Sequence, residues 1–216
     1  MEKKYELIPS DKEGLYRVKA LRSFSNVKAG DMGGYVSGED NLSHKGNCWI
    51  YDNAYVRENA RVFGHAVVRE NAVVCGDARV FGHAVVRENA WVYGNAAVSG
   101  DAVVYGDAEV FGNAGVNGDA CVRGFAEVHG DTRICGNAVV ESNKDYMVLK
   151  NWWSSGRYFT WTRSNDMWRV GCFYGSGEEL IKKAYADSKL SGKMYESTVN
   201  YVKELLKAEQ KLAEDK

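Results

Sequence analysis

The chain has few of the features that would assign it to a membrane, to nucleic acid or to an oxidising compartment. Its 216 residues include a single proline, Pro9, and its formal net charge at pH 7 is −1. A net charge so close to zero gives no global attraction to nucleic acid or to a membrane surface. No apolar run approaches membrane-spanning length, and the first residues lack the apolar core of a signal peptide. We therefore expect a soluble, cytoplasmic protein without a membrane or nucleic-acid partner.

Cysteine is present, but without the pairings that mark a disulfide framework or a metal site. The count of five is odd, and none of the cysteines belongs to a CxxC or CxxH motif. This usage is typical of free thiols in a reducing cytosol. The chain also lacks a phosphate-binding loop, a GxSxG elbow, an HExxH helix and a calcium loop. We therefore predict no metal and no resident cofactor.

What the chain does contain is a strict repeat. Residues 53–142 are fifteen consecutive hexads of the form [N/D/H/F]-[A/T]-x-[V/I]-x-[G/E/S], and residues 47–52 fit the same frame. The Ala and the Val of a hexad are two residues apart, so on a strand both side chains point to one side. Gly ends eleven of the fifteen hexads. Gly adopts positive φ without strain, and Asn, Asp and His are the other residues that tolerate it best. One of these three usually opens the next hexad. Each hexad is therefore predicted to be one short strand followed by one corner.

A short, strict period indicates stacked units that are each too small to bury their own apolar face. Three hexads close one triangular coil, and the next coil stacks on it in parallel, roughly 4.8 Å away. A helical alternative is excluded because a Gly every six residues would be costly in a helix. The fold class predicted here is an all-β solenoid, a left-handed parallel β-helix.

The hexads resemble those of the hexapeptide-repeat superfamily, whose fold is the left-handed parallel β-helix and whose members are usually trimers. The lead-in to the repeat resembles a poorly characterised branch found in enteric bacteria and bacteriophages. Its matching residues are Gly30-Asp31-Met32-Gly33-Gly34-Tyr35, Asn41-Leu42-Ser43 and Gly46-Asn47-Cys48-Trp49-Ile50-Tyr51. The resemblance implies a homotrimer located in a bacterial cell or a phage-infected host. It implies no particular activity, because fold alone does not give function.

The flanks of the repeat predict three segments: an N-terminal β cap and lead-in at 1–46, the β-helix at 47–143, and a C-terminal region at 144–216. The cap is expected to be a β-hairpin that covers the open end of the solenoid. The C-terminal region is expected to contain a three-stranded meander at 146–153, 157–163 and 167–174. Ser176 and Glu179 have the spacing of a capping box, which predicts a short helix to about 188, and a second helix follows at 193–215.

Outward side chains that are one coil, or three hexads, apart must lie above one another, so the columns on each face can be written from the sequence. One face carries a continuous apolar column that begins at Trp49. The column continues through Val67, Val85, Val103, Cys121 and Val139. A soluble monomer should not expose such a stripe, and burial against a second copy is its simplest fate. The alternative is purely structural, since β-branched residues also stack well on a strand surface.

A basic column runs beside the apolar one and contains Arg69, Arg87, Tyr105 and Arg123. Stacked like charges repel unless an anion, a carboxylate or solvent lies between them. Arg with Tyr is suited to gripping a phosphate and stacking on a ring, so a small anionic ligand in a groove between subunits is one hypothesis. The alternative is an ion-pair role, since Glu70 and Glu88 directly follow two of the arginines.

Two histidines supply the only catalytic suggestion. His65 and His83 are one coil apart and stack on one corner, and a His base suits proton transfer near neutral pH. In the acyltransferases of the superfamily that this chain resembles, such a His takes a proton from the acceptor. However, residues 60–72 and 78–90 are identical, so a duplicated coil explains both histidines without chemistry. No loop interrupts the hexads either, and we interpret both histidines as corner residues.

These patterns support one leading function and two alternatives. The leading hypothesis is a non-enzymatic trimeric binding or scaffold protein that holds a small anionic, nucleotide-like ligand between its subunits, for instance to sequester a host signal during phage infection. The first alternative is an acyltransferase that uses acyl-CoA. The second is a structural protein that polymerises through stacked ends.

Overall fold

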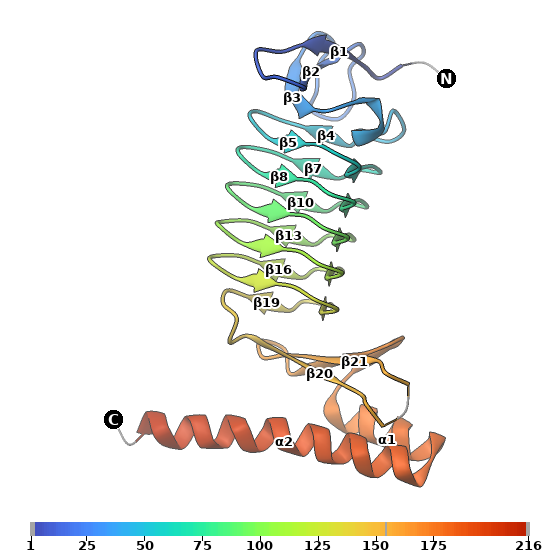
Figure 1. Cartoon of the computed structure of the whole chain (residues 1–216), viewed down its shortest axis with the longest axis vertical. Coiled ribbons are helices and arrows are strands. Elements are labelled where there is room, and N and C mark those ends of the chain that lie inside the picture. The colour runs from blue at the N-terminus through green and yellow to red at the C-terminus, as the bar shows by residue number, and fades with distance from the viewer. Residues whose placement is uncertain (1–2, 154, 215–216) are drawn as a thin grey trace. The chain divides into compact units, whose positions relative to one another are not determined.

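The structure is a computed structural model that describes residues 3–153 and 155–214 (Figure 1). The chain divides into two compact units. The solenoid unit is Met1–Met147 with Thr162–Asn165, and the C-terminal unit is Val148–Trp161 with Asp166–Lys216. No helix in the described ranges has the length and apolarity needed to cross a membrane.

Each hexad forms a strand of two residues followed by a corner, as the period predicts. The sixteen short strands are β4 (Trp49–Ile50), β5 (Tyr55–Val56), β6 (Arg61–Val62), β7 (Val67–Val68), β8 (Val73–Val74), β9 (Arg79–Val80), β10 (Val85–Val86), β11 (Trp91–Val92), β12 (Ala97–Val98), β13 (Val103–Val104), β14 (Glu109–Val110), β15 (Gly115–Val116), β16 (Cys121–Val122), β17 (Glu127–Val128), β18 (Arg133–Ile134) and β19 (Val139–Val140). Each strand pairs in parallel with its equivalent in the next coil, as Val67 does with Val85. The chain is thus a parallel β-solenoid, and the predicted start of the repeat at 47 is confirmed by β4, which pairs with β7.

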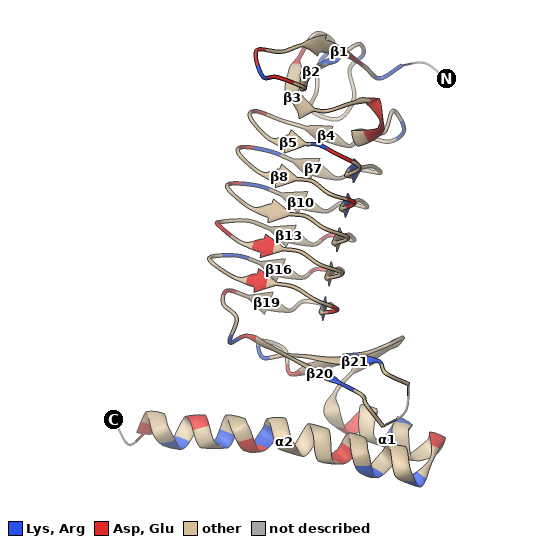
Figure 2. Cartoon of the chain, viewed as in Figure 1, with Lys and Arg blue, Asp and Glu red and all other residues tan. Residues whose placement is uncertain are grey.

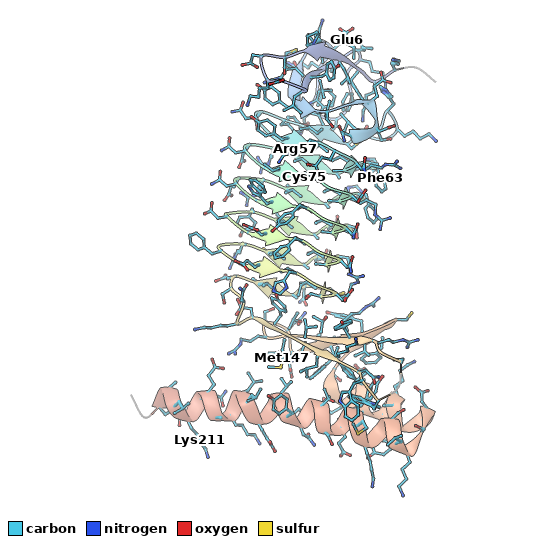
Figure 3. The ribbon with its side chains drawn as sticks, viewed as in Figure 1. Glu6, Arg57, Phe63, Cys75, Met147 and Lys211 are labelled. Atoms are coloured by element: carbon cyan, nitrogen blue, oxygen red, sulfur yellow. The ribbon has the colours of Figure 1, made fainter. Side chains whose placement is uncertain are left out.

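The strands form three sheets, one for each face of the prism. The first sheet begins with three strands that precede the repeat, β1 (Tyr5–Pro9), β2 (Tyr16–Ala20) and β3 (Met32–Val36), and continues β5-β8-β11-β14-β17. The second sheet runs β18-β15-β12-β9-β6, and the third β19-β16-β13-β10-β7-β4. Between them lies a narrow core of the predicted Ala and Val residues, which are fully buried from Ala54 to Val128. Figure 3 shows outward side chains such as Phe63 and Cys75 on the opposite surface of the strands. The inward and outward positions therefore follow the two-residue alternation of the strands.

The corners differ from the prediction in one respect. Positive φ is found at the sixth residue of a hexad, usually Gly, and not at the Asn, Asp or His that opens the next one. Gly100, for example, has φ 71°, and a Cβ there would lie 2.8 Å from the backbone N of Gly118. The sixth residue therefore has to satisfy both a left-handed conformation and close stacking of backbones, which only glycine does without strain.

The N-terminal segment is a hairpin, as expected, but it is continuous with the first sheet of the solenoid. Strands β1 (Tyr5–Pro9) and β2 (Tyr16–Ala20) are antiparallel, and β2 is antiparallel to β3 (Met32–Val36). The β3 strand then pairs in parallel with β5. A 3-10 turn at Glu39–Asn41 leads into the first coil. The cap thus covers the strand edges that the open end would otherwise expose.

The C-terminal unit contains a sheet and two helices, and the predicted elements need two corrections. The sheet has four strands, not three: β20 (Tyr146–Lys150), β21 (Tyr158–Thr162), β22 (Met167–Val170) and β23 (Phe173–Gly175). The expected third strand folds back on itself at Gly171, where φ is 57°. Helix α1 (Gly177–Asp187) has the predicted capping box, whereas helix α2 (Lys189–Glu214) begins four residues before its predicted start.

Candidate functional site

The third sheet brings the predicted apolar residues into one column. Neighbouring strands of this sheet are in register, so each outward residue lies beside its equivalent in the next coil. We call these five residues the valine column: Val67, Val85, Val103, Cys121 and Val139. All five are half-buried within the single chain. The column is therefore a narrow apolar strip that neighbouring side chains screen only in part.

Trp49, which the sequence places at the head of this column, does not share its exposure. The cap covers its indole, leaving 1% of the residue accessible. Phe24 packs edge-on against it, with ring centroids 5.4 Å apart. An added Cβ on Gly33 would lie 2.9 Å from the indole, so the cap backbone also approaches it closely. The exposed strip therefore begins at Val67, and sequence periodicity alone could not have shown that the cap folds over the first coil.

The residues of the basic column are also brought together, and we call Arg69, Arg87, Tyr105 and Arg123 the arginine ladder. The guanidinium carbon of Arg87 lies 4.1 Å from the centre of the Tyr105 ring. Arg123 Nη1 donates to the Tyr105 hydroxyl at 3.1 Å from the other side. Tyr105 is thus held between two arginines, one stacked on its face and the other bonded to its oxygen. A cation on the face of an aromatic ring is stabilised by the ring quadrupole.

Each arginine of the ladder has a carboxylate partner in the same chain. Arg69 lies 3.3 Å from Glu70, and Arg87 pairs with Glu88. Arg123 Nε donates to Glu141 at 2.7 Å. The pKa of Arg123 is raised by its hydrogen bonds to Tyr105 and Glu141. The ladder is therefore electrically balanced, and Figure 2 shows basic and acidic positions close together at these corners. Glu141 could have been found from sequence, since it stands one coil after Arg123.

Two of these glutamates have a second role that the sequence did not suggest. Glu70 and Glu88 have φ near 60°, where a non-glycine residue is strained. Their carboxylates accept backbone N–H bonds from the next coil: Glu70 from Glu88 at 2.8 Å, and Glu88 from Gly106 at 3.1 Å. Asp52 accepts from Glu70 in the same way at 3.1 Å. These corner acids link successive coils, and the bonds offset the backbone strain.

His65 and His83 stack as predicted, on the corner that precedes β7 and β10. Their ring centroids are 4.7 Å apart and the rings are nearly parallel. Both residues are exposed, and in the described part of the chain no hydrogen bond orients either imidazole. A catalytic base is normally oriented by a second polar group. The histidines therefore lie beside the valine column without the surroundings of a catalytic pair.

A hollow of about 520 Å³ lies near the cap end of the second sheet. Its lining includes Asp40, His44, Arg61 and Phe63. The imidazole of His44 accepts a hydrogen bond from the backbone N of Lys4 at 3.2 Å through Nδ1 and stacks on the Tyr5 ring. Burial lowers the pKa of His44. Among the described residues, no group of three or more His, Cys, Asp or Glu side chains is arranged to hold a metal ion, here or elsewhere.

Comparison with known proteins supports the repeat architecture. A family model described as the YdcK β-solenoid repeat matches residues 90–106. The chain is also 43% identical over 54 residues to a protein of Escherichia coli (strain K12) that is described as the uncharacterized acetyltransferase YdcK. That alignment covers 25% of this chain and 15% of the relative. The resemblance to hexapeptide-repeat β-solenoid proteins is therefore confirmed at the level of the repeat.

Proposed function

We propose that this chain is a non-enzymatic binding or scaffold protein that assembles into a homotrimer through its third sheet. The observation that carries this proposal is the valine column, which is apolar over five coils and remains half-buried in the single chain. Removal of apolar surface from water contributes about 25 cal/mol for each Å², which favours contact with a second copy. The number of three subunits comes from the resemblance to hexapeptide-repeat proteins.

The ligand proposed for the assembled protein is a small anion of the nucleotide kind, bound between subunits at the arginine ladder. Tyr105 offers a ring on which a base or a sugar can stack, and Arg87 and Arg123 offer guanidinium groups for a phosphate. In the single chain these guanidinium groups form ion pairs with the carboxylates of Glu88 and Glu141. Binding therefore requires the phosphate to displace them, which favours an anion with at least two charges. Sequestration of a host signal by a phage is one setting for such binding.

Native mass spectrometry of the protein purified from cells tests assembly and cargo together. We expect a trimer, and a mass released on denaturation would identify the ligand. Val103→Lys should abolish the trimer because it places a charge in the middle of the valine column. Val73→Lys is the matched control, since Val73 is an equally outward, half-buried residue on the first sheet. A monomeric wild type at tens of micromolar, or equal effects of both variants, would refute assembly through this face.

The ligand is tested separately by Arg87→Glu combined with Arg123→Glu. The pair should release the cargo and leave the trimer intact, because both side chains lie beside the column and not in it. Retention of the same cargo by the double variant would reject the ladder as its site. If the wild-type trimer carries no cargo, the scaffold role alone is supported.

An acyltransferase is the second candidate, favoured by the description of the matched relative and by the position of the two histidines beside the valine column. The measurement is transfer from acetyl-CoA to a panel of amines and hydroxyl compounds, with the wild type beside His83→Ala. Activity that falls at least a hundredfold in the variant would support this candidate. Failure of the wild type to bind CoA would remove it.

A further inference from the structure

Helix α2 carries a second apolar stripe that the C-terminal unit leaves uncovered. The stripe follows spacings of four, three and four residues through Tyr201, Leu205, Ala208 and Leu212. This is the period of a coiled-coil seam. Met194 and Thr198 continue the period toward the N-terminus, but they are half-buried and, together with Tyr201, line a hollow that Trp152 and Trp153 of the same unit also line. Tyr201, Leu205 and Leu212 are 50%, 39% and 67% exposed. A soluble helix normally turns such a stripe toward a partner.

The stripe is separate from the face that α2 uses within its own unit. The buried residues Val199 and Val202 and the half-buried Tyr195 and Leu206 face the rest of the unit. Tyr195 lies edge-on to Phe159, with centroids 4.8 Å apart. At about 100° per residue, the seam lies roughly 110° around the helix from this packed face. From Leu205 to Leu212 the helix therefore has a second apolar face that its own unit leaves exposed.

Charges beside the seam indicate both the partner and its direction. Leu205 and Leu212 take position a of a coiled-coil heptad. Glu204 and Lys211 then take position g, on the side of the helix away from the packed face. Both side chains are exposed, and neither forms an ion pair within the described residues. Figure 2 shows acidic and basic residues interspersed along α2, and Figure 3 shows Lys211 projecting from it.

We infer that α2 pairs antiparallel with α2 of a second copy of this chain. When Leu205 faces Ala208 of the other copy, Tyr201 faces Leu212, so a large residue meets a smaller or flexible one at each layer. The same register sets Glu204 opposite Lys211 twice, once on each side of the two-fold axis. A parallel pair would instead place Glu204 beside Glu209 of the other helix, where like charges repel. This contact is distinct from the valine column and does not depend on it.

Charge exchange tests the pairing without touching either apolar face. Glu204→Lys sets two ammonium groups opposite each other across the antiparallel dimer, and Lys211→Glu sets two carboxylates opposite each other at the same place. Each variant alone should raise the dissociation constant of the α2 contact about fivefold, measured by sedimentation of the full chain. Mixing the two variants pairs each new ammonium group with a new carboxylate, so native mass spectrometry should show mixed assemblies in excess of random exchange.

Lys207→Glu is the matched control, because Lys207 is exposed on α2 but lies off the seam. It should leave sedimentation unchanged and exchange at random with the wild type. The valine column does not include these charges, so assembly through it alone would also give random exchange. Random exchange between Glu204→Lys and Lys211→Glu, or tighter self-association of Glu204→Lys, would overturn the inference; the second result would indicate a parallel pair.

Discussion

The coils and the C-terminal unit bury their apolar side chains in contrasting ways. The coils use mostly the same two inward residues, Ala and Val, and each strand inside the stack pairs with its equivalents in the coils before and after it. The C-terminal unit relies on a few large rings: Phe159 lies edge-on to Trp168 and to Tyr195. In the coils the stabilisation from apolar burial is therefore divided among many equivalent contacts. In the C-terminal unit it is concentrated at one cluster of rings.

The largest expected effect comes from removing the centre of that cluster. Phe159→Ala should lower the free energy of unfolding of the C-terminal unit by about 3–5 kcal/mol, because the lost ring leaves a cavity among neighbours that cannot close it. Hydrogen exchange should accelerate in α1 and α2 while the amides of the coils stay protected. Val98→Ala is the comparison in the coils and should cost only about 1–2 kcal/mol. Equal losses of unfolding free energy for Phe159→Ala and Val98→Ala would contradict the proposed difference between the two units.

A smaller loss of stability is expected at the corner glycines, which must both adopt positive φ and let the backbones of successive coils stack closely. Two alanine substitutions separate these requirements. Gly100 and Gly130 have nearly the same positive φ, but an added Cβ meets the backbone of Gly118 in the first case and nothing within 4 Å in the second. Gly130→Ala should therefore cost about 1 kcal/mol for backbone strain alone. Gly100→Ala should cost about 2–3 kcal/mol because the stacked backbones must also separate. Chemical denaturation of both variants measures the difference. Identical costs would mean that coil stacking adds nothing.

The smallest effect depends on pH and concerns the cap. Burial lowers the pKa of His44, so the folded chain favours its neutral ring. The contribution of this ring to stability is complete above its unfolded pKa of about 6.5 and is lost as the pH falls through the lower folded pKa. Protonation also removes the acceptor for the backbone N of Lys4. The melting temperature should therefore fall by a few degrees between about pH 7.5 and about pH 5.

His44→Asn should reduce this fall, because its amide oxygen can accept the same bond at either pH. His65→Gln is the control, since His65 is exposed and lies outside the cap. This variant should still show the fall in melting temperature that His44 causes. A profile for His44→Asn that coincides with that of the wild type would exclude His44 as the titrating group.

Sequence periodicity predicted the coils well because one local rule repeats in them. A six-residue period fixes which side chains point inward, where the corners fall and which residues share a column, and the structure confirms each at Val67, Val85 and Val103. The valine column, the arginine ladder and the histidine stack were all placed correctly for the same reason. Their roles in binding, assembly or catalysis remain predictions.

In the segments outside the hexad repeat, local sequence patterns predicted the structure less completely. The expected third strand of the meander reads as one alternating run, yet the positive φ of Gly171 turns it into a hairpin. Ser188 was expected only as a helix end, but it ends α1 and also accepts from the backbone N of Ser191 at the start of α2. The burial of Trp49 depends on its contact with Phe24, which belongs to a separate segment of the chain. These features arise from tertiary contacts and backbone conformations that a sequence window does not contain.

The identity of residues 60–72 and 78–90 has a consequence for how such a protein changes over generations. Because strands in successive coils dock in the same register, a coil inserted or deleted by unequal crossing-over between these segments leaves every remaining pairing in place. The length of the solenoid can therefore change in whole coils by a single recombination event. In such an event the valine column and the arginine ladder lengthen or shorten together, so the size of the proposed interface is inherited with the number of repeats.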